Sequence, residues 1–106
     1  MELRVADNPN KARYEITALS GNGDGEIAGF ISYHLAGNAI SLVHTETDPR
    51  FRGHGIGGQL VKAALDSARE RGLEVLPYCP FVRSWMGEHP EYADLVPAPR
   101  RAEFGL

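Results

Sequence analysis

The feature that most constrains this chain is a glycine-rich loop between an alternating segment and a helical one. Residues 50–58 read Arg-Phe-Arg-Gly-His-Gly-Ile-Gly-Gly. Glycine lets the backbone approach an anion closely, and the start of a helix offers unpaired N–H groups with positive dipole potential. The loop can therefore hold a phosphate group, with Arg50 or Arg52 adding a charge-assisted bond. A tight strand-to-helix turn that binds nothing is the alternative interpretation of the same glycines.

Four strands are predicted before the loop. Apolar and polar residues alternate in four segments separated by turn residues, which are residues 2–7, 13–19, 26–35 and 39–48. The glycines of residues 20–25 allow positive backbone angles, so this segment is predicted to join the second and third strands as a hairpin. A run of strands joined by short turns predicts antiparallel pairing.

After the loop, the apolar residues recur at helical spacing. One face of the predicted helix carries Ile56, Leu60, Val61, Ala64, Leu65 and Ala68. Gly72 is a natural stop for this helix. Residues 73–78 then form a short apolar strand, which is expected to lie parallel to the fourth strand through a right-handed crossover. Residues 81–86 can start a second helix, and the prolines of the tail, residues 97–106, favour a frayed end.

Length and charge limit the possible classes of protein. The 106 residues suit one domain. The prediction is a single α+β domain over residues 1–106, in the order ββββαβα, with a mostly antiparallel sheet and one parallel pair. The formal net charge of -3 argues against a nucleic-acid or membrane partner. The start has no apolar signal-peptide run and no segment approaches the roughly 20 apolar residues of a membrane span, so a cytoplasmic protein is expected.

The histidines and the single cysteine do not predict a metal site. Cys79 is the only cysteine, which excludes an internal disulfide. His44, His54 and His89 are the candidate partners of Cys79 in a metal site, but no pair of these residues has the close spacing that usually marks metal ligands. No metal is therefore expected.

Two other glycine motifs fit less well. A Walker loop requires Lys and Ser or Thr after its last glycine, and neither follows Gly58. Residues 53–58 do carry the Gly-x-Gly-x-x-Gly spacing of dinucleotide sites. However, that motif follows the first parallel strand of its sheet, whereas this loop follows an antiparallel run. The 30 or so residues after the predicted helix cannot complete a dinucleotide-binding sheet.

The run Arg50-x-x-Gly53-x-Gly55 resembles the acyl-CoA signature of the GCN5-related N-acetyltransferase (GNAT) family, which is [Arg/Gln]-x-x-Gly-x-[Gly/Ala]. Residues 42–45 and 77–79 more narrowly resemble the small single-domain NATD-type members. The resemblance extends from about residue 13 to residue 96 and implies a minimal GNAT-like fold with acetyl-CoA as cosubstrate. The cofactor-binding residues that it implies are Thr45, Thr47, Arg52, Gly53, His54, Gly55, Ile56, Gly57 and Gly58.

The same resemblance implies His44 and Cys79 as the catalytic pair. If the fourth and fifth strands splay, both side chains could line the space where the acetyl group sits. Imidazole can accept a proton at neutral pH. Cys79 followed by Pro80 is typical of a helix N-cap and first residue, a position that favours thiolate. A covalent acetyl-cysteine route is therefore one alternative, and direct transfer with His44 or Glu46 acting through water is the other.

The chain also departs from the family pattern. A glycine turn stands where most members have two helices between their first strands, and little chain follows Trp85. The expected function is acetyl transfer to an amine on a small molecule or a protein. A non-catalytic CoA-binding or protein-interaction module is the main alternative, and a small nucleotide-phosphate-binding domain is a second one. Phe81, Trp85 and Met86 either pack in the core or cover the pantetheine arm.

Overall fold

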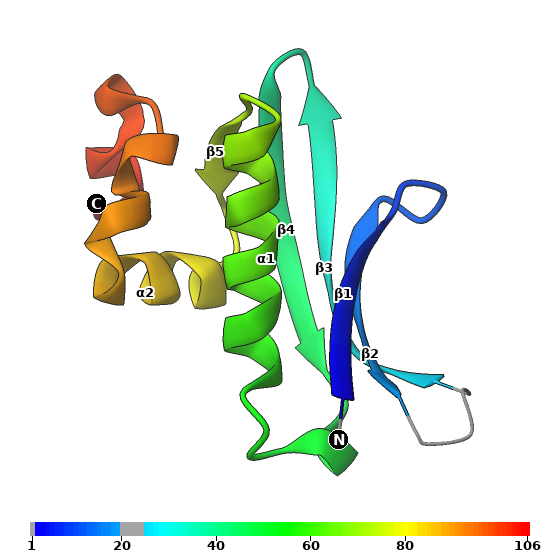
Figure 1. Cartoon of the computed structure of the whole chain (residues 1–106). Helices are drawn as coiled ribbons and strands as arrows, with labels where there is room; N and C mark the ends of the chain where they lie inside the picture. Colours follow the sequence, from blue (N-terminus) through cyan, green and yellow to red (C-terminus); the bar gives the residue numbers. More distant parts are fainter. Residues whose placement is uncertain (1, 20–24) are drawn as a thin grey trace.

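The computed structural model of the protein describes residues 2–19 and 25–106. Its elements follow the predicted order ββββαβα (Figure 1). The strands are β1 (Glu2–Asn8), β2 (Arg13–Leu19), β3 (Gly25–Ala36), β4 (Ala39–Thr47) and β5 (Glu74–Pro77), and the helices are α1 (Ile56–Glu70) and α2 (Pro80–Glu88). The prediction of an α+β fold is confirmed. The predicted hairpin turn at residues 20–25 lies outside the described residues except for Gly25.

The strands form one sheet in their sequence order, β1-β2-β3-β4-β5. The first three pairings are antiparallel, and β4 and β5 pair in parallel, as predicted. The parallel pairing is short, because it joins only Ala39–Leu42 to the four residues of β5. The remainder of β4 therefore extends beyond the end of its partner.

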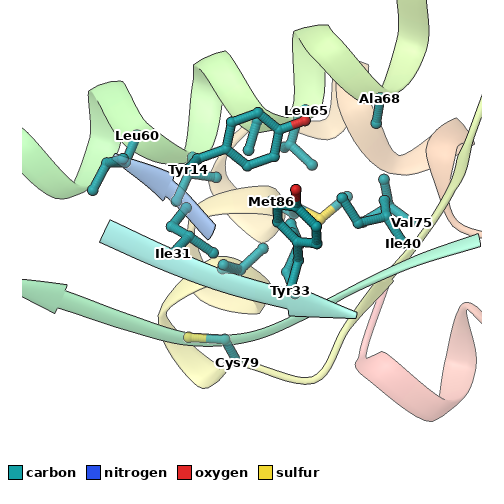
Figure 2. Close-up of a cluster of buried hydrophobic side chains, with 14 of the residues drawn as sticks. Tyr14, Ile31, Tyr33, Ile40, Leu60, Leu65, Ala68, Val75, Cys79 and Met86 are labelled. Atoms are coloured by element: carbon teal, nitrogen blue, oxygen red, sulfur yellow. The ribbon is translucent and has the colours of Figure 1, made fainter. Parts of the chain in front are cut away.

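Helix α1 covers one face of the sheet, and its apolar face forms the core with the strands. All six residues predicted for that face are buried. Figure 2 shows Leu60 and Leu65 of the helix on one side of the cluster and Ile31 of β3 on the other. Each of these three side chains is fully buried. Burying each such side chain stabilises the fold by roughly 1.5–3 kcal/mol. The positions of α1 that face the core are therefore apolar, and they recur at helical spacing in the sequence.

A β-bulge at Val43 reverses which residues of β4 face the helix. Leu42 pairs with Tyr33 and His44 pairs with Ser32, so Val43 has no partner in the β3–β4 register. A bulge of this kind inserts one extra residue and bends the strand. Thr45 therefore lies opposite the buried Ile31, on the helix face of the sheet. His44, one residue earlier, points to the opposite face.

The C-terminal segment packs against the end of β5, although its prolines favoured a frayed tail. It forms two short 3-10 helices, Ala98–Arg100 and Ala102–Phe104. The side chain of Phe104 is buried and meets the ring of Tyr78 edge-on, with ring centroids 5.3 Å apart. Arg100 donates a hydrogen bond of 3.0 Å to the Tyr78 hydroxyl. An aromatic anchor near the end of the chain thus holds a segment whose local composition suggests mobility.

Candidate active site

Asp48 organises the chain between β4 and the glycine-rich loop. Its Oδ1 accepts a hydrogen bond from the Arg50 backbone N–H at 2.9 Å. The Arg50 side chain bonds to Asp48 at 2.8 Å and to Glu26 at 2.9 Å. Its hydrogen bonds to Asp48 hold the pKa of that carboxyl below its usual range. Arg50 is thus occupied by carboxylates, whereas Arg52 is exposed and lines a pocket, so Arg52 is the arginine placed to meet an anion.

The loop glycines adopt a backbone conformation that other residues rarely reach. Gly53 has φ of 87° and Gly55 has φ of 69°, both in the left-handed region. Gly55 is the N-cap of α1, and the first helical hydrogen bond runs from the Gln59 N–H to its carbonyl oxygen at 3.1 Å. The N–H groups of residues 56–58 therefore precede the first helical bond and have no acceptor within the helix. They are available to an anion.

These groups border a pocket of about 400 Å³. Its lining includes Arg52, the glycines of the loop and the first turn of α1, with Thr47 at the end of β4 and Phe81 of α2 completing the walls. His54 is the one residue of the predicted 52–58 set that does not line it. Its side chain is exposed, and its carbonyl oxygen accepts a hydrogen bond from the Gln59 side chain. The pocket suits a phosphate-bearing ligand, because N–H groups and a cation meet in it.

The strands β4 and β5 separate beyond Leu42. The last backbone link between them is the hydrogen bond from the Cys79 N–H to the Leu42 carbonyl at 2.9 Å. Beyond it, within the described residues, no strand pairs with β4 on that side. Thr45 and Thr47 both lie on this unpaired stretch. An extended ligand with amide groups can pair with a free strand edge of this kind.

Cys79 lies at the start of α2, close to Thr45. It is the N-cap of that helix, as predicted, and its side chain is only 4% exposed. The Cys79 Sγ and the Thr45 Oγ1 are 3.3 Å apart. The sequence offered no sign of this contact, because the two residues are 34 positions apart.

His44 contacts Glu46 and not Cys79, its predicted catalytic partner. Its Nε2 lies 3.2 Å from Glu46 Oε2, and its ring centroid is 6.1 Å from that of Phe30. Because His44 and Thr45 leave β4 on opposite faces, the strand separates the imidazole from the Cys79 thiol. The structure therefore brings Thr45 to Cys79 and Glu46 to His44. His44 and Cys79 both lie where β4 and β5 part, but not in mutual contact.

The large apolar residues of α2, Phe81, Trp85 and Met86, have different surroundings. Met86 is fully buried and packs in the core (Figure 2). Trp85 stacks on His89, with ring centroids 3.7 Å apart. Phe81 is 46% exposed and lines the loop pocket. The sequence left open whether Phe81 packs in the core or covers a ligand. Its position at the start of the predicted second helix was the one sequence feature available to decide.

Two further observations concern other ligands. Among residues 2–19 and 25–106, no group of three or more His, Cys, Asp or Glu side chains is arranged to hold a metal ion. Within the same residues, no helix combines the length and apolar character that crossing a bilayer requires.

The sequence of the chain matches known proteins. The family model described as GCN5-related N-acetyl-transferase matches residues 13–95. "Protein NATD1" of Danio rerio is 27% identical over 96 residues, covering 89% of this chain and 84% of the relative. "Protein NATD1" of Homo sapiens is 32% identical over 88 residues, covering 83% and 75%. Streptothricin acetyltransferase of Streptomyces lavendulae is 40% identical over 58 residues, covering 53% of this chain and 31% of the relative.

A solved structure gives the same picture for the fold. A GCN5-like protein from Staphylococcus aureus, determined by NMR in solution, superposes with a TM-score of 0.66 at 24% identity and covers 90% of this chain and 88% of its own. The family model and the fold together define an acetyltransferase-type domain. The chain belongs to the GCN5-related N-acetyltransferase family.

Proposed function

We propose that this protein transfers an acetyl group from acetyl-CoA to an amine acceptor. The observation that carries the proposal is the loop pocket, where unpaired N–H groups of residues 56–58 and the exposed Arg52 suit the pyrophosphate of CoA. The free edge of β4 at Thr45 and Thr47 suits the amide groups of the pantetheine arm. Family membership and the partial match to a curated acetyltransferase support the reaction type.

Cys79 supports a covalent route. Cys79 is the N-cap of α2, and the Thr45 hydroxyl, 3.3 Å from its sulfur, can donate a hydrogen bond to it. The Cys79 sulfur would attack the thioester carbon, forming an acetyl-cysteine while CoA leaves as its thiolate. The acceptor amine would then form the C–N bond, the bond to Cys79 would break, and the amine proton would pass to a base.

His44 and Glu46 support direct transfer instead. Here the amine attacks the acetyl-CoA thioester in one step, and CoA leaves as its thiolate. The amine must lose a proton to a base, and the exposed His44 imidazole can accept it. Glu46, 3.2 Å from the His44 Nε2, orients the ring. In the covalent route, the amine that attacks acetyl-Cys79 must likewise pass its proton to a base.

Calorimetric titration with CoA and with acetyl-CoA tests the proposal, followed by intact mass of the same samples under non-reducing conditions. Saturable binding of both ligands is expected. A mass gain of about 42 Da that disappears in Cys79→Ala identifies the covalent route. Full acetyltransferase activity in Cys79→Ala excludes that route and leaves direct transfer. If neither ligand binds, the proposal is wrong.

A CoA-binding module without turnover is the second candidate, favoured by the strand that separates His44 from Cys79. It predicts CoA binding without acetylation of any amine offered. A nucleotide-phosphate site predicts competition by ATP but none by CoA. The calorimetric titration therefore separates the candidates when ATP is included as a third ligand.

A further inference from the structure

A second pocket, of about 370 Å³, lies beside the loop pocket. Its walls include Arg13 of β2, Phe30 of β3 and Glu46 of β4. The segment 47–49 lines both pockets, so they share a wall at the end of β4. Donor and acceptor must meet in a transferase, and two pockets on either side of one strand end are suited to that task.

The second pocket has one apolar wall and two acidic groups. Phe30 supplies the apolar surface, and the Arg13 guanidinium lies over its ring at 4.4 Å from the centroid. Arg13 is also bonded to Glu15 at 2.7 Å, so its charge is balanced within the wall. Glu46 and Asp48 both line the pocket, two residues apart on extended backbone. Residues spaced in this way lie about 7 Å apart.

The charges around this pocket favour a cation. The lining residues and their ion-pair partners include the carboxylates of Glu15, Glu46 and Asp48. The arginines among them are Arg13 and Arg50. Three carboxylates and two guanidinium groups leave an excess of one negative charge. An excess of this sign raises the local concentration of amines in their ammonium form.

Glu46 connects the pocket to the proposed base. It lines the pocket, and its Oε2 is 3.2 Å from His44 Nε2. The Phe30 ring likewise lines the pocket and neighbours the His44 ring. In the described chain, β4 has no strand partner on its β5 side past Leu42. An acceptor on the outer face of β4 can therefore meet a donor on the helix face at this open edge.

We propose that this second pocket is the acceptor site and that the acceptor is a diamine. One amine lies at His44 and Glu46, where it loses its proton and reacts. The apolar chain lies against Phe30, and the second amine, as an ammonium ion, lies near the Asp48 carboxylate. The inference rests on the proposed acetyl transfer and narrows its acceptor to compounds with two amino groups separated by a short hydrocarbon chain.

Amine binding to CoA-saturated protein tests this inference. The probes are 1,5-diaminopentane and n-pentylamine, which share the hydrocarbon chain and differ in the second amine. We expect the diamine to bind at least tenfold more tightly, in calorimetry at pH 7. Glu46→Gln should weaken diamine binding by about tenfold, since it removes one charge without changing the size of the side chain. Phe30→Ala should weaken both amines.

Glu74→Gln is the matched control, because Glu74 is exposed on β5 beside Ala39, at the other end of β4. It should leave amine binding unchanged, and all three variants should bind CoA like the original protein. Equal affinity for the two amines, or diamine affinity unaffected by Glu46→Gln, overturns the inference while CoA binding and acetyl transfer stand. If CoA does not bind, the proposed function fails, and the same titrations on the protein alone still decide whether the pocket prefers the diamine.

Discussion

The ring of Phe81 lies so close to Gly57 that a Cβ atom at that glycine would come within 2.6 Å of Phe81 Cζ. Gly57 lies in the first turn of α1, and Phe81 lies in the first turn of α2. The glycine is therefore required by packing, and not by an unusual backbone angle. The contact makes Phe81 a wall of the loop pocket and ties the position of α2 to that of the proposed pyrophosphate site.

Gly57→Ala should weaken CoA binding by roughly tenfold, because the new methyl group pushes the Phe81 ring from its place in the pocket wall. Stability should change little, since this ring is 46% exposed and can turn outward. Calorimetry in a double-mutant cycle with Phe81→Ala checks the mechanism. In the Phe81→Ala background, Gly57→Ala should cost much less affinity. Additive losses would show that the methyl group acts on the ligand directly.

Gly55→Glu should abolish CoA binding. The side chain would enter the loop with a negative charge, where the pyrophosphate is proposed to bind, and the left-handed φ of 69° would strain any residue with a Cβ. Gly37→Glu is a matched control, because Gly37 has φ of 60°, has open space around it and lies in the turn between β3 and β4. It should bind CoA normally despite similar backbone strain. Retained CoA affinity in Gly55→Glu would contradict the loop assignment.

Thr45→Val should slow the formation of acetyl-Cys79 by roughly 10- to 100-fold. The substitution keeps the shape but removes the hydroxyl 3.3 Å from Sγ, and a hydrogen bond to a charged group contributes about 1.5–3 kcal/mol. Rapid mixing with acetyl-CoA, followed by intact mass, measures the rate. Thr45→Ser keeps the hydroxyl and should remain close to the original rate. Equal rates in the Val and Ser variants would mean that the contact only packs the strand against α2.

Tyr33 should make the fold sensitive to alkaline pH. Its side chain is buried and donates a hydrogen bond of 2.6 Å to Asp7, and burial together with this carboxylate raises its pKa to about 12. An unfolded tyrosine titrates near pH 10. Above that pH the unfolded chain loses a proton that the folded chain keeps, so stability is fully present below about pH 10 and is lost as the pH rises through about 12.

Tyr33→Phe should remove this dependence. Urea unfolding midpoints at pH 9, 10 and 11 measure it, and the original protein should lose more stability over this range than the variant. Tyr78→Phe, at a tyrosine that is 44% exposed, is the control and should follow the original curve. Parallel curves for the original protein and Tyr33→Phe would assign the alkaline loss to other groups.

The elements of the fold were predictable because their signals are local. The alternation in residues 13–19 and the helical spacing from Ile56 to Ala68 both depend on which neighbours share a face, and each appears within one segment of chain. The glycine-rich run before Ile56 predicted a loop that leads into a helix for the same reason. The parallel pairing of β4 and β5 followed from the order of elements, since a strand, a helix and a short apolar strand have few ways to close.

The pairing of side chains at the site was not local. One unpaired residue, Val43, turns Thr45 toward the helix face and His44 away from it, and no pattern in the sequence marks that bulge. Side-chain orientation in a strand has a period of two, so one extra residue reverses every later position. The packed tail was not predictable either, because the contact between Phe104 and Tyr78 depends on how β5 and α2 pack.

The sequence by itself therefore determined the order of elements, the buried face of α1 and the loop able to receive an anion, all of which arise from interactions between near neighbours in the chain. The tertiary structure alone decided that Cys79 meets Thr45, that His44 meets Glu46 on the other face, and that Phe81 closes the pocket against Gly57. The physical reason is that contacts between distant residues depend on strand register and on the packing of one helix against another, which the whole sheet sets together.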